Sequence, residues 1–328
     1  MNVEIATKLR GAKLTAWQEL ITAAGLAPGE PVDRIALLWD GDELVATASR
    51  TENLFKYIAV KANRQGEDLT ATVISALRAD AFSDGHSHLF LYTKPENASV
   101  FSSLFFYPVA MTDKVLLMEN RQNGIKDFIS SLNPPKKDGK FGALVINCNP
   151  FTLGHQSLIE AASAACERVY VFVLSEDKSR FSAKDRIEMV RIGTSHLKNV
   201  TVLPTGPYLI SSATFPTYFI KDRDAIGEIQ CLLDVEIFAK HFAPAFSIVE
   251  RYVGTEPLSP LTDRYNRVLA EELPKRGIKL VEVERKTAHG APISASLVRE
   301  CITKGDTEAL RDLLPQSTID YLNRNNLI

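Results

Sequence analysis

Over the first 130 positions, apolar residues form short clusters that turn signals separate. Two clusters at 34–39 and 44–49 flank Asp40-Gly41-Asp42, and such a pair predicts a β-hairpin. Leu69 to Ala79 instead repeats apolar residues at helical spacing. Further strand-like clusters lie at 55–60, 89–92 and 115–118. A strand meander followed by a helix and more strands predicts an α+β domain.

The pattern changes after a polar segment that contains Pro134-Pro135. Tandem prolines exclude a regular helix or a central strand, so this segment is expected to be a linker. We place the linker at 131–140, between a domain at 1–130 and a second domain at 141–328.

Beyond the linker, near-continuous apolar strands alternate with helices. The expected strands are 143–146, 169–174, 200–203, 251–253 and 279–283, and the first helices are 156–166 and about 183–197. Strands that are buried on both faces and alternate with helices predict a doubly wound parallel sheet, and hence an α/β domain. Ligands bind such sheets beyond the carboxyl ends of the strands, so the residues that follow each strand are the candidates for function.

Composition narrows the class of protein. The 328 residues include 45% hydrophobic and 24% charged residues, with 38 Lys and Arg against 40 Asp and Glu. Such a balance argues against broad electrostatic binding to nucleic acid or to an anionic membrane. The chain has no apolar run of the ~18–20 residues that span a bilayer. Its four cysteines lie far apart, which argues against a disulfide framework or a zinc site, so we expect a cytoplasmic protein without a dedicated metal site.

The first strand after the linker is followed by a turn that ends in Thr152-Leu153-Gly154-His155. Gly154 would let the backbone approach a ligand closely. His155 lies at a helix start, where free amide protons and the helix dipole favour anions. The turn therefore predicts phosphate binding, although a polar helix cap with a surface histidine would have the same sequence.

Two further clusters follow other strands. Lys178 and Arg186 follow the second strand, and Ser294 and Arg299 follow the fifth, where the serine can cap a helix. Each cluster alone is also typical of a solvated basic loop or an ordinary helix start. Together with the turn at His155, they indicate an anion site at one edge of the sheet.

These motifs resemble those of the HxGH nucleotidyltransferase superfamily. Thr152 to His155 resembles its (H/T)-x-G-H signature, and Ile293 to Arg299 resembles its I-S-S-T-x-x-R/K signature. The segment from Lys178 to Arg186 is similar to one in phosphopantetheine adenylyltransferases. Longer strings resemble the citrate (pro-3S)-lyase ligase family, namely 147–155, 212–219, 253–257 and Tyr265-Asn266. This resemblance covers about 140–325 and implies a nucleotidyltransferase-like domain preceded by an acetyltransferase-like (GNAT) domain.

The resemblance also implies an activity. That family uses ATP and acetate to acetylate the thiol of the CoA-like prosthetic group on the acyl carrier subunit of citrate lyase, through an acetyl-adenylate. ATP would arrive with Mg²⁺ bound to its phosphates. The catalytic residues implied are His155, Lys178 and Arg299. The implied ATP contacts are Asn147, Asn149, Phe151, Thr152, Gly154, His155, Arg186, Gly254, Glu256, Ser294, Ser296 and Arg299.

Two other functions stay open at this point. One is an adenylyltransferase that joins AMP to a nucleotide or a phosphopantetheine-like acceptor. The other is a CoA-binding regulator without catalysis, built on the first domain. In that domain the GNAT pyrophosphate loop corresponds to 63–68, where Gly66 matches but Asp68 replaces a second glycine. Acidic side chains beside this loop would repel the pyrophosphate of CoA. We therefore do not expect catalysis with acetyl-CoA in this domain. Recognition of the prosthetic group or its carrier is the alternative.

Overall fold

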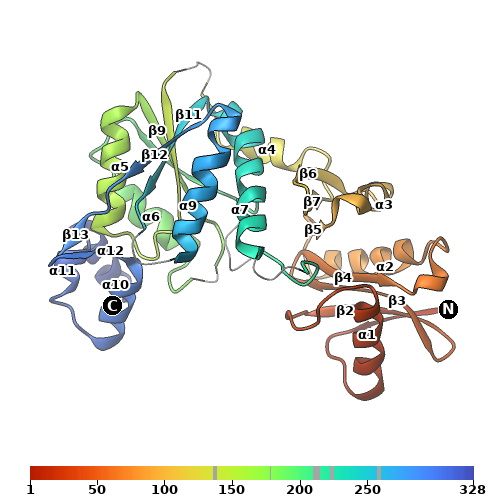
Figure 1. Ribbon diagram of the computed structural model, residues 1–328. Helices are drawn as coiled ribbons and strands as arrows, with labels where there is room; N and C mark the ends of the chain where they lie inside the picture. The colour runs from red at the N-terminus through yellow and green to blue at the C-terminus, as the bar shows by residue number, and fades with distance from the viewer. Residues whose placement is uncertain (136–138, 178, 210–214, 222–224, 257–259) are drawn as a thin grey trace. The chain divides into compact units, whose positions relative to one another are not determined.

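The described residues form two large β-sheets and one short two-stranded sheet (Figure 1). The computed structural model describes residues 1–135, 139–177, 179–209, 215–221, 225–256 and 260–328. They form two compact units, and each is discontinuous in sequence. The first unit comprises Met1–Gly124 and Pro216–Ile229, and the second comprises Ile125–Phe215 and Gln230–Ile328.

The sheet of the first unit has seven strands in the order β1-β2-β3-β4-β5-β7-β6. Neighbouring strands are antiparallel except β4 and β5, which are parallel. The strands are β1 (Asn2–Ala6), β2 (Arg34–Asp40), β3 (Glu43–Thr51), β4 (Leu54–Val60), β5 (Phe90–Thr93), β6 (Tyr107–Met111) and β7 (Leu116–Glu119). The predicted hairpin is confirmed as β2–β3, whereas β1 and β6 were not predicted.

Helices cover this sheet. The predicted helix is confirmed as α2 (Leu69–Ser83), and α1 (Gly11–Ala23) and α3 (Ala98–Ser103) accompany it. Seven consecutive residues of β3, 44–50, are buried, which requires cover on both faces of the strand. Both α1 and α2 contact β3, and they lie on opposite sides of the sheet (Figure 1). The first unit thus has the α+β architecture that was predicted.

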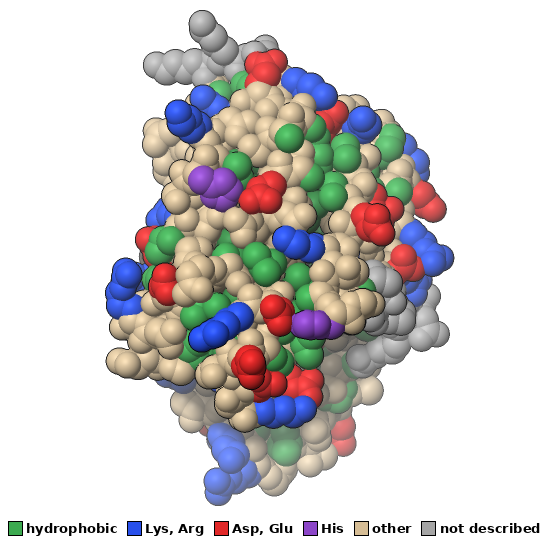
Figure 2. Space-filling model, turned by 90° about the vertical axis from the view of Figure 1, so that its left-hand side faces the viewer, with side chains coloured by type: hydrophobic (Ala, Val, Ile, Leu, Met, Phe, Trp, Pro, Cys, Tyr) green, Lys and Arg blue, Asp and Glu red, His purple; other side chains and the backbone are tan. Residues whose placement is uncertain are grey.

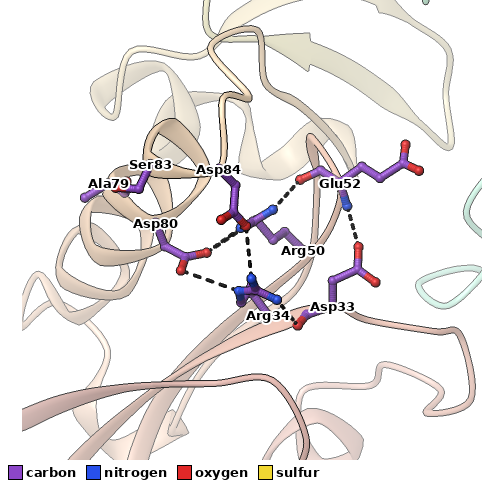
Figure 3. A network of polar contacts seen from close by, with 8 residues as sticks. All are labelled: Asp33, Arg34, Arg50, Glu52, Ala79, Asp80, Ser83 and Asp84. Carbon is purple, nitrogen blue, oxygen red and sulfur yellow. Dashed lines mark hydrogen bonds and ion pairs between the residues drawn. The ribbon is translucent and has the colours of Figure 1, made fainter.

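One of those buried β3 residues is charged, and a network of ion pairs compensates it (Figure 3). Arg50 donates to Asp80 on α2 at 2.6 Å and to the Glu52 carbonyl at 2.9 Å, and it also pairs with Asp84. Arg34 on β2 pairs with Asp84 at 3.2 Å. Because both carboxylates are neutralised, the network holds α2 on the sheet and offers no unpaired charge for a ligand.

A short segment from late in the sequence, 216–221, belongs to the first unit. The Glu30 carboxylate accepts hydrogen bonds from the amides of Thr217 (2.6 Å) and Tyr218 (3.0 Å), and its other oxygen pairs with Lys56 at 3.0 Å. The ring of Tyr218 lies 4.4 Å from that of Tyr57 on β4. Strand β4 therefore packs against a segment that lies far from it in sequence.

The second unit contains a parallel five-stranded sheet in the order β10-β9-β8-β11-β12. The strands are β8 (Phe141–Ile146), β9 (Arg168–Val173), β10 (Val200–Pro204), β11 (Ile248–Gly254) and β12 (Lys279–Val283). All five predicted strands are confirmed, as is the doubly wound topology. Strand order reverses between β8 and β11, which is where ligands bind in open α/β sheets.

Helices lie on both faces of this sheet. Helices α5 (Leu153–Ala165) and α6 (Ala183–Gly193) cover one face, and α7 (Ile226–Ile237) and α9 (Pro260–Glu272) lie on the other (Figure 1). Further elements of this unit include α4 (Gly124–Ser131), α8 (Ala243–Ala245), the hairpin β13 (Thr287–Ala288) and β14 (Ala291–Pro292), α10 (Ala295–Lys304), α11 (Leu310–Leu313) and α12 (Gln316–Arg324). Acidic and basic side chains are interspersed on the face shown in Figure 2. Within the described ranges, no helix has the length and apolar character to cross a membrane.

Candidate active site

The turn between β8 and α5 holds the predicted phosphate-binding motif in a capping box. Thr152 is the N-cap of α5, and its hydroxyl accepts a hydrogen bond from the His155 amide at 3.3 Å. In return, the Thr152 amide donates to Nδ1 of His155 at 3.1 Å. Two of the free amide groups at the helix start are thus satisfied by the motif itself. The histidine is part of the helix cap and keeps one ring nitrogen for a ligand. The two interpretations of the motif, a helix cap and a phosphate-binding turn, are therefore compatible.

The capping box determines the tautomer of His155. One ring nitrogen accepts the hydrogen bond of the cap, and the other faces outward and carries the proton. An amide can only donate, so Nδ1 must accept and the proton of the neutral ring lies on Nε2. Burial, together with the nearby charge of Arg285, lowers the pKa of His155 to about 4. The ring is therefore neutral at pH 7 and presents Nε2–H as a hydrogen-bond donor.

Apolar packing holds the imidazole in place. The Phe151 ring stacks on it, with ring centroids 6.1 Å apart and an angle of 16° between the planes. Phe151 is fully buried, and a Cβ added at Gly193 on α6 would lie 2.3 Å from it. The described contacts of Phe151 thus support packing of His155, and its contact with ATP stays a prediction.

The start of α10 is brought next to the same turn. Arg299 donates to the Asn149 carbonyl at 2.6 Å and to the Ser296 hydroxyl at 2.9 Å. Ser294 caps α10 by accepting from the Leu297 amide at 3.1 Å. A Cβ at Gly154 would lie 3.5 Å from the Ile293 carbonyl, which is ordinary contact. The protein itself would tolerate a side chain there, so close approach of a ligand is the better reason for glycine.

Arg186, a predicted ATP contact, is fully buried and directed into the protein. Its guanidinium donates to the carbonyls of Phe181 and Asn147, both at 3.1 Å, and to that of Glu176. It also reaches the Asn147 side chain. These bonds connect the segments that follow β8 and β9, so the described contacts support a role in fixing both turns. Contact with ATP stays a prediction.

At the ends of β11 and β12, the structure reveals a partner that sequence reasoning missed. Glu256 pairs with Arg285 at 2.7 Å, and the Arg285 amide donates to the Thr255 hydroxyl at 3.0 Å. Asn266 on α9 donates to the Gly254 carbonyl at 2.9 Å. Arg285 follows the fifth strand directly, so the rule that identified the other candidates could have found it.

Several other residues and segments complete the description of the candidates. Lys178 lies outside the described residues. Cys148 is buried, and burial raises the pKa of its thiol, which disfavours the nucleophilic thiolate. In the first unit, Arg64 pairs with Glu67 at 2.6 Å and with Asp40 at 2.9 Å, so acids surround the loop at 63–68. Among the residues that the structure describes, no group of three or more His, Cys, Asp or Glu side chains could hold a metal ion.

Comparisons with known proteins identify relatives of this chain. The family model for the citrate lyase ligase C-terminal domain matches residues 141–322. The citrate (pro-3S)-lyase ligase of Klebsiella pneumoniae is 39% identical over 85% of this chain and 83% of its own length. The enzyme of that name from Escherichia coli strain K12 is 36% identical over 86% and 82%. A phosphopantetheine adenylyltransferase from Nostoc punctiforme is 45% identical over 16% of this chain and 31% of its own. The crystal structure of Escherichia coli ElaA aligns with 37% of this chain and 100% of its own, at 18% identity and a TM-score of 0.32.

Proposed function

We infer that this chain, which belongs to the citrate (pro-3S)-lyase ligase family, uses ATP to acetylate citrate lyase. It is an enzyme of the ligase class. We propose further that the acyl donor is acetate and that the acceptor is the thiol of a CoA-like prosthetic group on the acyl carrier subunit. The observation that carries the proposal is the neutral His155 with its outward Nε2–H, on a turn at the carboxyl edge of a parallel sheet whose Asn149 carbonyl accepts a hydrogen bond from Arg299.

The proposed reaction has two steps. In the first, an acetate oxygen attacks the α-phosphorus of ATP, and pyrophosphate leaves with the electron pair of the broken P–O bond. In the second, the thiol sulfur attacks the acetyl carbonyl and loses its proton to solvent, while AMP leaves. Adenylation supplies the leaving group that acetate lacks. The protein's contribution is to position the reactants and to stabilise charge on the phosphoryl group.

The residues divide into those that would touch the nucleotide and those that support them. Nε2–H of His155 would donate to a phosphate oxygen, and Arg299 would supply fixed positive charge. Thr152 and Phe151 hold the imidazole, and Ser296 orients Arg299. Mg²⁺ would bind the ATP phosphates and reduce their charge, since it keeps several waters and seldom needs a protein cage.

A pyrophosphate-release assay tests the proposal. The full chain is incubated with Mg·ATP, acetate and citrate lyase whose carrier thiol is free, and the products are identified by mass spectrometry. We expect pyrophosphate, AMP and an acetylated thiol, and no pyrophosphate without acetate. Pyrophosphate together with AMP joined to a pantetheine phosphate would instead indicate the adenylyltransferase. Failure to bind ATP would contradict both functions.

A further inference from the structure

We propose that Arg285 is a phosphate-binding residue of this site and that Glu256 acts by positioning it. The inference rests on the proposed use of ATP. It also changes the part expected of Glu256, from a direct contact with ATP to support of a cation.

Hydrogen bonds fix the backbone around Arg285 to the ends of β11 and β12 and to the start of α10. Its amide donates to the Thr255 hydroxyl at 3.0 Å, and the Thr255 amide donates to the Val283 carbonyl at 2.9 Å, which joins the ends of β11 and β12. The next residue, Lys286, accepts from the Ile293 amide at 3.0 Å. Ile293 in turn packs against Gly154 of the phosphate-binding turn. Arg285 thus lies on a segment that connects β11, the start of α10 and the motif.

The side chain of Arg285 has donors to spare. Its Nη2 donates to Glu256 at 2.7 Å, and within the described ranges no other group accepts a hydrogen bond from this guanidinium. Its side chain is 24% exposed, whereas that of Glu256 is 7% exposed. Arg186 differs in that its guanidinium is fully buried against carbonyl groups. The carboxylate is therefore the enclosed partner, and the arginine is the one that can reach a ligand.

The charge of Arg285 is felt at the phosphate-binding turn, since it contributes to the lowered pKa of His155. Burial is the larger cause of that lowered pKa, and the nearby cation adds to it. The neutral histidine and Arg285 are therefore two different donors for one anion: an uncharged N–H and a fixed positive charge. A triphosphate carries charge enough for both of them and for Arg299.

Binding of ATP and of adenosine to the full chain, measured by calorimetry, tests the inference. We expect Arg285→Gln to weaken ATP binding at least tenfold and to change adenosine binding less than twofold, with Arg285→Lys between wild type and Arg285→Gln. Arg276→Gln is the matched control, because Arg276 is 29% exposed and pairs with Glu236 and Glu272 in the same unit. It should bind ATP like the wild type. Thermal melts of every variant verify folding.

A double-mutant cycle tests the part assigned to Glu256. If Glu256 acts through Arg285, Glu256→Gln should weaken ATP binding in the wild type but not in the Arg285→Gln background. If it contacts adenosine, the two losses will add, adenosine binding will weaken, and its positioning role is overturned. ATP binding by Arg285→Gln within twofold of wild type would overturn the inference while leaving the proposed function intact. A wild-type chain that does not bind ATP would overturn both.

Discussion

The hydrogen bond from the Thr152 amide to His155 allows one substitution to separate the cap from the outward donor. In His155→Asn, the side-chain oxygen can still accept from that amide, but nothing replaces Nε2–H. We predict that kcat falls about 10²- to 10³-fold, the usual effect of losing one donor to a developing oxyanion, while the melting temperature changes little. Steady-state pyrophosphate release and thermal melts measure the two effects. His196→Asn is the control, since His196 is half exposed and pairs with Glu160; near-normal turnover of His155→Asn would remove this residue from the chemistry.

The same residue should make stability depend on pH. The pKa of His155 is about 4 in the folded chain, against an ordinary value near 6.5. Between these values the unfolded chain binds a proton that the folded chain does not, so stability falls as pH falls from about 6.5 to about 4. The loss is at most about 3 kcal/mol, from about 1.36 kcal/mol for each pKa unit. Urea unfolding from pH 4.5 to 7.5 should show a smaller loss for His155→Asn; equal slopes for the two proteins would contradict the prediction.

For single residues, the sequence could predict which side chains lie close together because they follow the ends of neighbouring strands. Thr152 and His155 follow β8, and Arg299 lies on the helix after β12, so proximity follows from the topology. It could not predict where a guanidinium points. Arg186 and Arg285 both follow strands, but the first lies inside the protein and the second pairs at a partly exposed position. That difference depends on three-dimensional packing and on which carbonyl groups need a donor.

Among the secondary-structure elements, α6 is tied by Arg186 to the segments that follow β8 and β9. We predict that Arg186→Ala destabilises the protein by about 3 kcal/mol or more, because buried carbonyl groups lose their donor and a cavity remains. Arg191→Ala on the same helix is the control, since Arg191 is half exposed and should cost less than about 0.5 kcal/mol. Denaturant unfolding compares the two. Unchanged stability with a raised KM for ATP in Arg186→Ala would favour direct contact with the nucleotide.

Elements with a strong periodic pattern were predictable, and elements that depend on a neighbour were not. The five strands of the parallel sheet are apolar enough to be recognised individually. Strand β1 lies at an edge of its sheet, where it pairs with β2. Helix α1 begins after Arg10, which forms no side-chain cap. Such elements depend on tertiary contacts, which a local pattern does not reveal.

For the whole molecule, the relevant feature is the segment 216–221 in the first unit. We predict that a fragment of residues 1–130 is less stable than the full unit by roughly 4 kcal/mol, because three apolar side chains no longer cover it. Those side chains, all buried in the full chain, belong to Tyr218, Phe219 and Ile220. A synthetic peptide of residues 215–221 should raise the fragment's melting temperature as its concentration rises.

Glu30→Gln in the fragment provides the control for that experiment, since Glu30 accepts two amides of the segment. It should weaken the effect of the peptide, whereas Glu19→Gln at an exposed position should not. If the peptide leaves the melting temperature of the fragment unchanged, the prediction is contradicted. The proposed boundary at 131–140 therefore describes where the polypeptide changes pattern, and sequence alone gave no sign that a later segment completes the first unit.

The hydrogen bonds that Glu30 accepts from Thr217 and Tyr218 also determine the order of folding steps during translation. Domains commonly fold from the amino terminus as they leave the ribosome. Here the leading unit is completed only after three strands of the following sheet have been synthesised, and until then the face of Tyr57 that packs on Tyr218 lacks its partner. A chain released early, by a stop codon between the two segments, would therefore present an incomplete leading domain to chaperones and proteases.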